Sequence, residues 1–403
     1  MRARANKGIS SEVRGSYEKF PYPAVGKVAQ LGRVWRIAPM EWIDAMWHAE
    51  SDDPQRILVA GCGTGDETFA FRRRFPRAEI TGVDFSARSI KVAQKLRRHV
   101  PRAENIRFLR ADLINDCLSR IVGTGFDFIS CHGVLSYIPA PERAIENLAN
   151  CLAPKGALFL GVNGREHFSE KWRQTLPQFG FDLNQFEDGP NLRRVLRLHD
   201  AVTEDPFAVA RQGAAYLTSD LFAPMISNRP LAYWTKLCRR SGLHFSGSYV
   251  SHRSVWPVLN SNLYDLFIPR SRAMVHELVE QIQPTSFHYV VFQRQRERNP
   301  PWRDPKLLKD CRVSVTKIYS QRWPRHRNGW LALRDLTLKS KSTNTIVDLR
   351  LPEWMIEILR RSNTGKSVGE VLNEIDAPVS ERTIRKHLYL LYLLALINLT
   401  PPR

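Results

Sequence analysis

The chain lacks an apolar run of the length that crosses a bilayer, which is about 18 residues or more. The longest candidate, residues 388–399, is shorter and starts as an amphipathic segment, so it predicts a buried helix. Residues 1–11 are basic and lack the apolar core of a secretory signal. We therefore expect neither a membrane span nor a signal peptide in this sequence.

Cysteine is scarce, and its spacing has no pattern. The six cysteines form no Cys-x-x-Cys pair and no zinc-ligand spacing; they stand at positions 62, 117, 131, 151, 238 and 311. We interpret them as reduced thiols of a cytoplasmic protein and expect no bound metal.

Acidic residues are few relative to basic ones. The chain has 60 Lys and Arg against 40 Asp and Glu, a formal net charge of +20. Residues 294–341 carry 14 basic and 4 acidic residues, which is half of the surplus. Such a segment predicts contact with a polyanion: nucleic acid, anionic lipid or an acidic protein. A solvated Arg-rich surface is an equal alternative, and both interpretations stay open.

Short apolar runs alternate with helical patterns through the first half of the chain. Strands are expected at 56–60, 79–84, 106–110, 126–131 and 157–162, and helices at 66–75, 87–99 and 141–152. Ser86 fits the N-cap of the second of these helices. The alternation predicts a parallel, doubly wound sheet.

Two later apolar runs, 243–250 and 287–292, follow a helical segment at 230–241 and fit the sixth and seventh strands of the same sheet. Residues 164–228 then form a helical insertion. We expect an N-terminal cap (1–50), a core (51–299) and a C-terminal domain (300–403). That last domain has helical patterns at 352–361, 367–375 and 380–396, with Ser367 and Ser380 as N-caps, and resembles a winged-helix unit.

The most informative motif is Ile57-Leu-Val-Ala-Gly-Cys-Gly-Thr-Gly65, an apolar strand that runs into a Gly-x-Gly-x-Gly turn. Asp84 follows about twenty positions later, at the end of the next strand. Glycine lets the backbone approach a ligand closely, and the helix that follows offers free N–H groups to an anion. Together they predict a nucleotide pocket.

Four further segments accompany this motif: Gly82–Ser86, Arg110–Leu113, Phe126–Leu135 and Leu152–Leu158. With these five segments in order, residues 56–163 resemble the class I S-adenosylmethionine-dependent methyltransferases. The resemblance implies a seven-stranded Rossmann-like sheet. The opening Tyr-x-x-Phe-Pro-Tyr-Pro also resembles an N-terminal cap of some bacterial members. More loosely, residues 164–403 are similar in pattern to bacterial lysine methyltransferases that act on outer-membrane proteins.

The resemblance implies S-adenosylmethionine as the cofactor. The backbone of Ala60, Gly61, Cys62, Gly63 and Gly65 is expected to bind its carboxylate end. Asp84 would accept from its ribose hydroxyls and Asp112 from its adenine amine, with Phe85 and Leu113 beside the adenine ring and Tyr17 and Tyr22 as a lid. The alternatives are cap or turn roles for the two aspartates and loop-anchoring roles for the two tyrosines.

The sequence departs from the family at Val59, where many members carry an acidic residue. We therefore expect a backbone carbonyl near Gly61, or Cys131, to bind the cofactor's amino group. His132, at the end of the fourth strand, is a candidate general base with a pKa near 7, and equally a wall of the pocket. Tyr137 is a further candidate for contact with cofactor or substrate.

The Asn/Asp-Pro-Pro-Tyr/Phe motif of enzymes that methylate base amines or glutamine amides is absent after the fourth strand. We expect a protein side chain as the acceptor, with a small metabolite and then RNA as alternatives; aromatic residues within 294–341 favour RNA. A non-catalytic cofactor-binding protein is the rival class. Arg382, Arg385 and Lys386 could read DNA, but the apolar end of that helix favours protein or homodimer contact.

Overall fold

The computed structural model describes most of the chain in sixteen stretches. These are residues 2–19, 21–22, 43, 46–47, 54–183, 189–202, 219, 221–248, 271–283, 285–296, 300–316, 319–321, 333–340, 346–362, 365–375 and 379–402. The chain divides into two compact units: one holds 1–38, 51–244 and 284–294, and the other holds 39–50, 245–283 and 295–403. The domain boundaries expected from the sequence stay a prediction.

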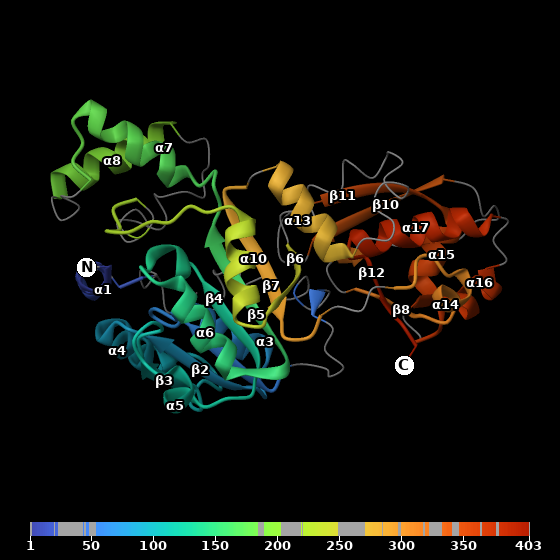
Figure 1. Cartoon of the computed structure of the whole chain (residues 1–403), viewed down its shortest axis with the longest axis horizontal. Helices are drawn as coiled ribbons and strands as arrows, with labels where there is room; N and C mark the ends of the chain where they lie inside the picture. The colour runs from blue at the N-terminus through green and yellow to red at the C-terminus, as the bar shows by residue number, and fades with distance from the viewer. Residues whose placement is uncertain are drawn as a thin grey trace. The chain divides into compact units, whose positions relative to one another are not determined.

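A seven-stranded sheet has the strand order β3-β2-β1-β4-β5-β7-β6 (Figure 1). Its strands are β1 (Arg56–Ala60), β2 (Glu79–Asp84), β3 (Arg107–Arg110), β4 (Phe126–His132), β5 (Leu152–Asn163), β6 (His244–Ser248) and β7 (Phe287–Gln293). The seven-stranded Rossmann-like sheet is confirmed. The expectation of a parallel sheet holds from β3 to β5 and is wrong at β7, which pairs antiparallel with β5. Mixed sheets commonly carry such a strand.

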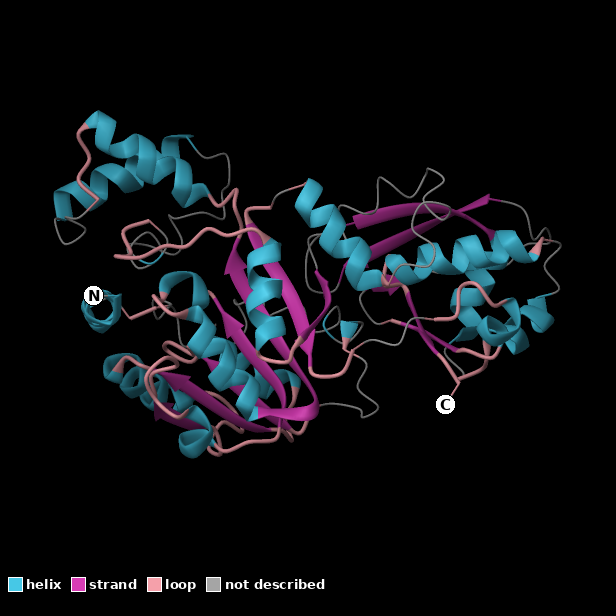
Figure 2. Cartoon of the chain, viewed as in Figure 1, coloured by secondary structure: helices cyan, strands magenta, loops and turns pink. Residues whose placement is uncertain are grey.

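Four helices begin within one residue of their predicted starts: α3 (Asp66–Arg74), α4 (Ala87–Leu96), α6 (Pro141–Cys151) and α10 (Leu231–Arg240). The short helix α5 (Leu118–Val122) was not predicted. Ser86 caps α4, since its hydroxyl accepts from the Ser89 N–H at 3.0 Å. Helices α6 and α10 lie side by side across the sheet (Figure 2). Their apolar faces and the strands bury a continuous core.

The helical insertion is confirmed in the described part of 164–228. It contains α7 (Phe168–Thr175), the 3₁₀ turn η4 (Leu176–Phe179) and α8 (Gly189–Val202). Leu176, Val195, Leu221 and Phe222 form a small core of its own. The described residues of this segment lie between β5 and β6 in the chain and contribute no strand to the sheet.

The C-terminal part combines short strands with helices. These elements are α13 (Arg272–Ile282), α14 (Pro305–Lys309), β8 (Arg312–Val315), β9 (Tyr319–Gln321), β10 (Leu333–Ser340), β11 (Ile346–Pro352), α15 (Glu353–Arg361), α16 (Val368–Ile375), α17 (Glu381–Leu393) and β12 (Ile397–Thr400). The three predicted helices are confirmed, and Ser367 and Ser380 accept from the N–H groups of Glu370 and Thr383. The winged-helix likeness stays a prediction.

Arg272, at the start of α13, is fully buried in the second unit. Its guanidinium donates to the carbonyl groups of Tyr392 and Ile397 and to Asn398 Oδ1, and it lies 4.0 Å from the centre of the Tyr392 ring. A buried charge is costly unless it is hydrogen-bonded, and this one is. Arg272 therefore fixes α13 against the end of α17 and β12.

The basic segment 294–341 is only partly described, so contact with a polyanion stays a prediction. Trp302, one of its aromatic residues, is 1% exposed and packs against Tyr389 and Tyr392. It is therefore a core residue and does not offer a face for base stacking. Trp323 and Trp330 lie outside the described residues.

Within the described residues, no helix has both the length and the apolar character that a membrane span requires. All six cysteines are free thiols, and every one except Cys117 is buried. Burial raises the pKa of the Cys151 and Cys311 thiols to about 11, so both stay protonated at neutral pH.

Candidate active site

The turn after β1 is built from three glycines with positive φ. Gly61, Gly63 and Gly65 have φ of 75°, 52° and 94°. The N–H groups of Gly61 and Cys62 donate to the carbonyl of Val83 at 2.8 and 2.9 Å, which ties the turn to β2. At Gly61 an added Cβ would collide with the Val134 side chain. The turn therefore needs glycine for its conformation and for its close approach to the loop after β4.

Asp84 ends β2 beside this turn. Its Oδ2 accepts from the Gly63 N–H and its Oδ1 from the Ser86 N–H, both at 2.9 Å. Burial raises the pKa of the Asp84 carboxyl to about 6, a shift that these two hydrogen bonds oppose. An ionised carboxylate has about four acceptor sites, so the two oxygens can each accept a further hydrogen bond from a ligand.

Asp112, after β3, serves a turn and an ion pair at once. Its Oδ1 accepts from the N–H groups of Ile114 and Asn115 at 2.9 and 3.3 Å. Its Oδ2 lies 3.1 Å from the Arg14 guanidinium. The turn role weighed as an alternative for Asp112 is thus present, and the residue also faces the pocket.

The N-terminal helix α1 (Arg2–Lys19) covers this end of the site. Tyr17 packs edge-on against Phe85, with 5.9 Å between ring centres. The Glu18 carboxylate accepts from the N–H groups of Ala87 and Arg88 at 2.7 and 3.1 Å, so it caps α4 from outside. The carbonyl of Tyr22 accepts from the N–H of Thr64 in the glycine turn. Both tyrosines therefore lie against the pocket.

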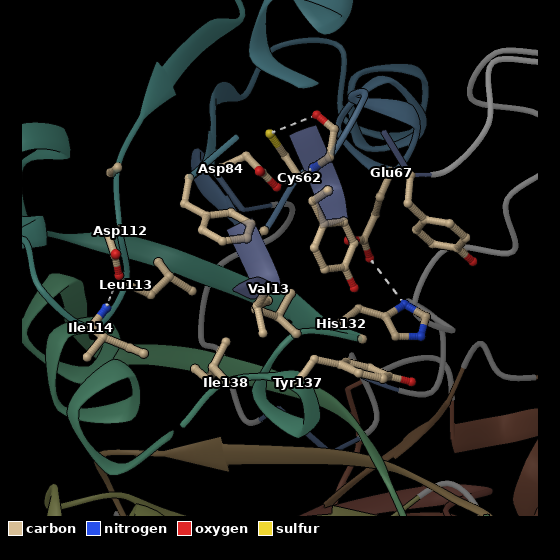
Figure 3. A pocket seen from close by; sticks show the side chains of 18 of the residues that line it. Val13, Cys62, Glu67, Asp84, Asp112, Leu113, Ile114, His132, Tyr137 and Ile138 are labelled. Carbon is tan, nitrogen blue, oxygen red and sulfur yellow. Dashed lines mark hydrogen bonds and ion pairs between the residues drawn. The ribbon is translucent and has the colours of Figure 1, made fainter. Parts of the chain in front are cut away.

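His132 ends β4 among aromatic rings and beside a carboxylate (Figure 3). The ring centres of Phe287 and Tyr289 each lie 5.6 Å from its own. Glu67 Oε1 lies 3.9 Å from Nδ1, but burial dominates and lowers the pKa of His132 to about 4. The pKa near 7 expected from the sequence is therefore wrong, and the imidazole is neutral at pH 7.

Tyr137, in the turn η3 (Leu135–Tyr137), forms the wall next to His132. Its hydroxyl accepts from Asn163 Nδ2 at 3.2 Å, and Asn163 is fully buried at the end of β5. Asn163 Nδ2 also lies 3.2 Å from Asn228 Oδ1, which belongs to the insertion. A chain of amide groups thus holds the Tyr137 ring at the edge of the pocket.

One pocket gathers most of the residues expected from the sequence. Those that line it are Tyr17, Tyr22, Gly61, Cys62, Gly63, Asp84, Phe85, Asp112, Leu113, His132 and Tyr137. Apart from Tyr17 and Tyr22, which precede the sheet in the chain, they come from the carboxyl ends of β1 to β4, where ligands bind in open α/β sheets.

Three expected residues lie outside the lining: Ala60, Gly65 and Cys131. Ala60 is buried within its strand. An added Cβ at Gly65 would meet the side chains of Phe69, Ala93 and Phe108, so this glycine serves helix packing. Cys131 lies on the opposite face of β4 from Ser130 and His132, because side chains alternate along a strand.

Sequence reasoning missed eight residues of the lining: Val13, Glu67, Ala111, Ile114, Gly133, Val134, Ile138 and Pro139. Ala111, Gly133 and Val134 lie inside segments that carry the family resemblance but were not named as site residues. The others, apart from Glu67, are apolar wall residues with no motif of their own. Glu67 is the exception, since it is a carboxylate in the first turn of α3. Its position two residues after the last glycine of the turn was the available signal.

Comparison with known proteins agrees with this geometry. Residues 58–158 match the family model of a methyltransferase domain. An uncharacterized protein of Synechococcus sp. is 28% identical over 308 residues, 70% of this chain and 71% of its own. A malonyl-[acyl-carrier protein] O-methyltransferase of Halalkalibacterium halodurans is 28% identical over 131 residues, 32% of this chain and 47% of that enzyme. The chain spans about half the length of the named methyltransferases that it matches.

Among solved structures, PKMT2 from Rickettsia typhi has a similar fold. It matches with a TM-score of 0.55 and 13% identity over 91% of this chain and 76% of that one. The same protein has been solved in complex with AdoHcy. Residues 58–158 are a class I S-adenosylmethionine-dependent methyltransferase domain. Its cofactor is S-adenosylmethionine, and this domain supplies all of the pocket lining except Val13, Tyr17 and Tyr22.

Gly61 and Gly133, two glycines with positive φ in the loops after β1 and β4, allow a matched test. Gly133→Ala adds a methyl group in open space at φ of 67°, so it should cost about 1–2 kcal/mol of the free energy of unfolding for the backbone alone. Gly61→Ala adds the collision with Val134 and should cost about 1–3 kcal/mol more. Urea unfolding measures both, and Val134→Ala in the Gly61→Ala background should recover only the steric part. Equal losses for the two glycine variants would contradict this account.

Proposed function

We propose that the chain is a methyltransferase that transfers the methyl group of S-adenosylmethionine to a protein side chain. The observation that carries this proposal is the extent of the fold likeness to PKMT2, which covers 91% of the chain. The match to the malonyl-[acyl-carrier protein] O-methyltransferase stops at 131 residues. The parts beyond the methyltransferase domain are therefore shared with PKMT2, and they are the parts available to recruit a macromolecule.

In this proposal, residues at different strand ends bind different parts of the cofactor. The turn from Gly61 to Gly63 lies beside the amino-acid end of the cofactor, and its three N–H groups, which were expected to bind the carboxylate, donate instead to the Val83 carbonyl and to Asp84 Oδ2. Asp84 accepts from the ribose hydroxyls. Asp112 accepts from the adenine amine, while Phe85 and Leu113 flank the ring. The support is that all of these residues line one pocket.

Tyr17 and Tyr22 close the pocket from outside in the same proposal. Polar contacts hold helix α1 there, among them those of Glu18 with the start of α4 and of Arg14 with Asp112. Excluding water from the pocket strengthens the electrostatic interactions within it. The two tyrosines thus act as a lid.

Bound S-adenosylmethionine supplies an electrophilic methyl group on a sulfonium. The residues of the chain need only bind and align the acceptor, which by itself lowers the barrier by several kcal/mol. With a pKa of about 4, His132 is a weak base at neutral pH. We assign it, with Tyr137, to the wall that orients an acceptor arriving already deprotonated.

A small-molecule acceptor is the second candidate. Two relatives have names that give acceptors other than a protein side chain. They are the malonyl-[acyl-carrier protein] O-methyltransferase and a trans-aconitate 2-methyltransferase of Rhodopseudomonas palustris.

The case for an RNA acceptor is weaker, because Trp302 of the basic segment is buried and cannot stack on a base. Homodimer contact through α17 stays a prediction.

Transfer of a labelled methyl group decides between the acceptors. The chain is incubated with methyl-labelled S-adenosylmethionine and a lysate separated into protein, nucleic acid and small-molecule fractions. We expect the label in the protein fraction, in a form that survives precipitation and nuclease treatment and is lost on proteolysis. Label in the small-molecule fraction would establish the second candidate, and no transfer to any fraction would favour a non-catalytic cofactor-binding protein.

The affinity for the cofactor product should depend on pH through Asp84. A carboxylate accepts from ribose hydroxyls best when ionised, so the Kd for S-adenosylhomocysteine should rise below about pH 6, by up to tenfold per pH unit. Protonation of Asp84 stabilises the folded chain, because its folded pKa exceeds the unfolded value of about 3.9. The loss of affinity at low pH is therefore not caused by unfolding of the chain on protonation of Asp84. Calorimetric titration from pH 5 to 8 should show this pH dependence of the Kd in the wild type. Asp84→Asn should bind more weakly, with a Kd that changes little with pH. The same pH dependence in both proteins would refute the role of Asp84.

A further inference from the structure

Glu67 is a third carboxylate in the pocket, besides Asp84 and Asp112. It stands in the first turn of α3, and its side chain is 12% exposed. Its Oε1 accepts from the Ser130 hydroxyl at 2.9 Å, so a residue of β4 holds the carboxylate in place. Carboxylates are stabilised in their charged form at the N-terminus of a helix.

The three carboxylates come from successive strand ends. Asp112 follows β3, Asp84 ends β2, and Glu67 follows β1 and its glycine turn. Figure 3 shows them spread across the pocket, with Cys62 of the turn lying between Asp84 and Glu67. S-adenosylmethionine is elongated, with adenine, ribose and then the amino-acid part. If Asp112 and Asp84 bind adenine and ribose, the amino-acid part extends toward Glu67.

The amino-acid part carries an ammonium group, and a cation removed from water needs an anionic partner. Val59, near the end of β1, is apolar and fully buried, so it offers no carboxylate to this end of the pocket. The thiol of Cys131 lies outside the pocket lining, and burial raises its pKa, so it stays neutral. Glu67 is the acidic residue that lines this part of the pocket.

We infer that Glu67 binds the α-ammonium group of S-adenosylmethionine, and that Ser130 positions Glu67 for this contact. This inference rests on the proposed function, since it requires the cofactor in the pocket. The rival role for Glu67 is to orient His132. Its Oε1 is 3.9 Å from Nδ1, which is beyond hydrogen-bond distance, so the geometry favours the cofactor.

Two ligands that differ in one group test the inference. They are S-adenosylhomocysteine and its deamino analogue, in which hydrogen replaces the α-amino group. Wild type should bind S-adenosylhomocysteine on the order of tenfold more tightly than the analogue, as expected for a charge-assisted hydrogen bond. Glu67→Gln should lose that preference by weakening the first ligand, while its Kd for the analogue changes less than twofold.

Two further variants provide the controls. Asp66→Asn removes the neighbouring carboxylate of the same helical turn, which does not line the pocket, and should keep the wild-type preference. Ser130→Ala should reduce the preference partly, because Glu67 keeps its charge and loses its anchor. Calorimetry measures all four proteins against both ligands at pH 7.5.

The outcomes separate the inference from the function beneath it. If Glu67→Gln weakens both ligands equally, or changes neither, Glu67 does not bind the ammonium group and the inference is wrong. If Asp66→Asn loses the preference as fully as Glu67→Gln, the preference comes from the negative charge at the start of α3 and not from contact with Glu67, and the inference is also wrong. If wild type binds neither ligand, the proposed function itself fails.

Discussion

The site depends on one constraint, which is that the backbone after β1 must turn sharply enough to leave room for a ligand and still hydrogen-bond to β2. Gly61 meets this constraint with a positive φ and with no side chain to strike Val134. Its N–H and that of Cys62 both donate to the carbonyl of Val83. The same turn sets where α3 begins, and therefore where Glu67 lies. The arrangement of the carboxylates follows from this single piece of backbone.

Desolvation then sets the charge of the groups around that turn. It raises the pKa of Asp84 to about 6, and it lowers the pKa of His132 to about 4. At pH 7 the first is an anion and the second is neutral, so the pocket as a whole offers negative charge to a sulfonium nucleoside. Methyl transfer in such a pocket relies on binding and alignment more than on proton transfer.

The strands, the helix caps and most of the pocket could be predicted from the sequence, because each has a local signal. Ser86 caps its helix as predicted, and Asp84 lies at the strand end where the glycine motif places it. What could not be predicted depends on tertiary contacts. The antiparallel direction of β7, the pKa of His132 and the approach of Arg14 to Asp112 all arise from segments far apart in sequence. Glu67 was missed because a helix-terminal glutamate ordinarily faces solvent.

A crystal structure of the chain grown with S-adenosylhomocysteine tests the central claim most directly, because it locates the ligand independently of turnover. The account predicts the nucleoside in the pocket at the strand ends, with its ribose hydroxyls within hydrogen-bond distance of Asp84 and its amino-acid part beyond the turn at Gly61. A ligand bound elsewhere, or one whose ribose does not reach Asp84, would contradict it.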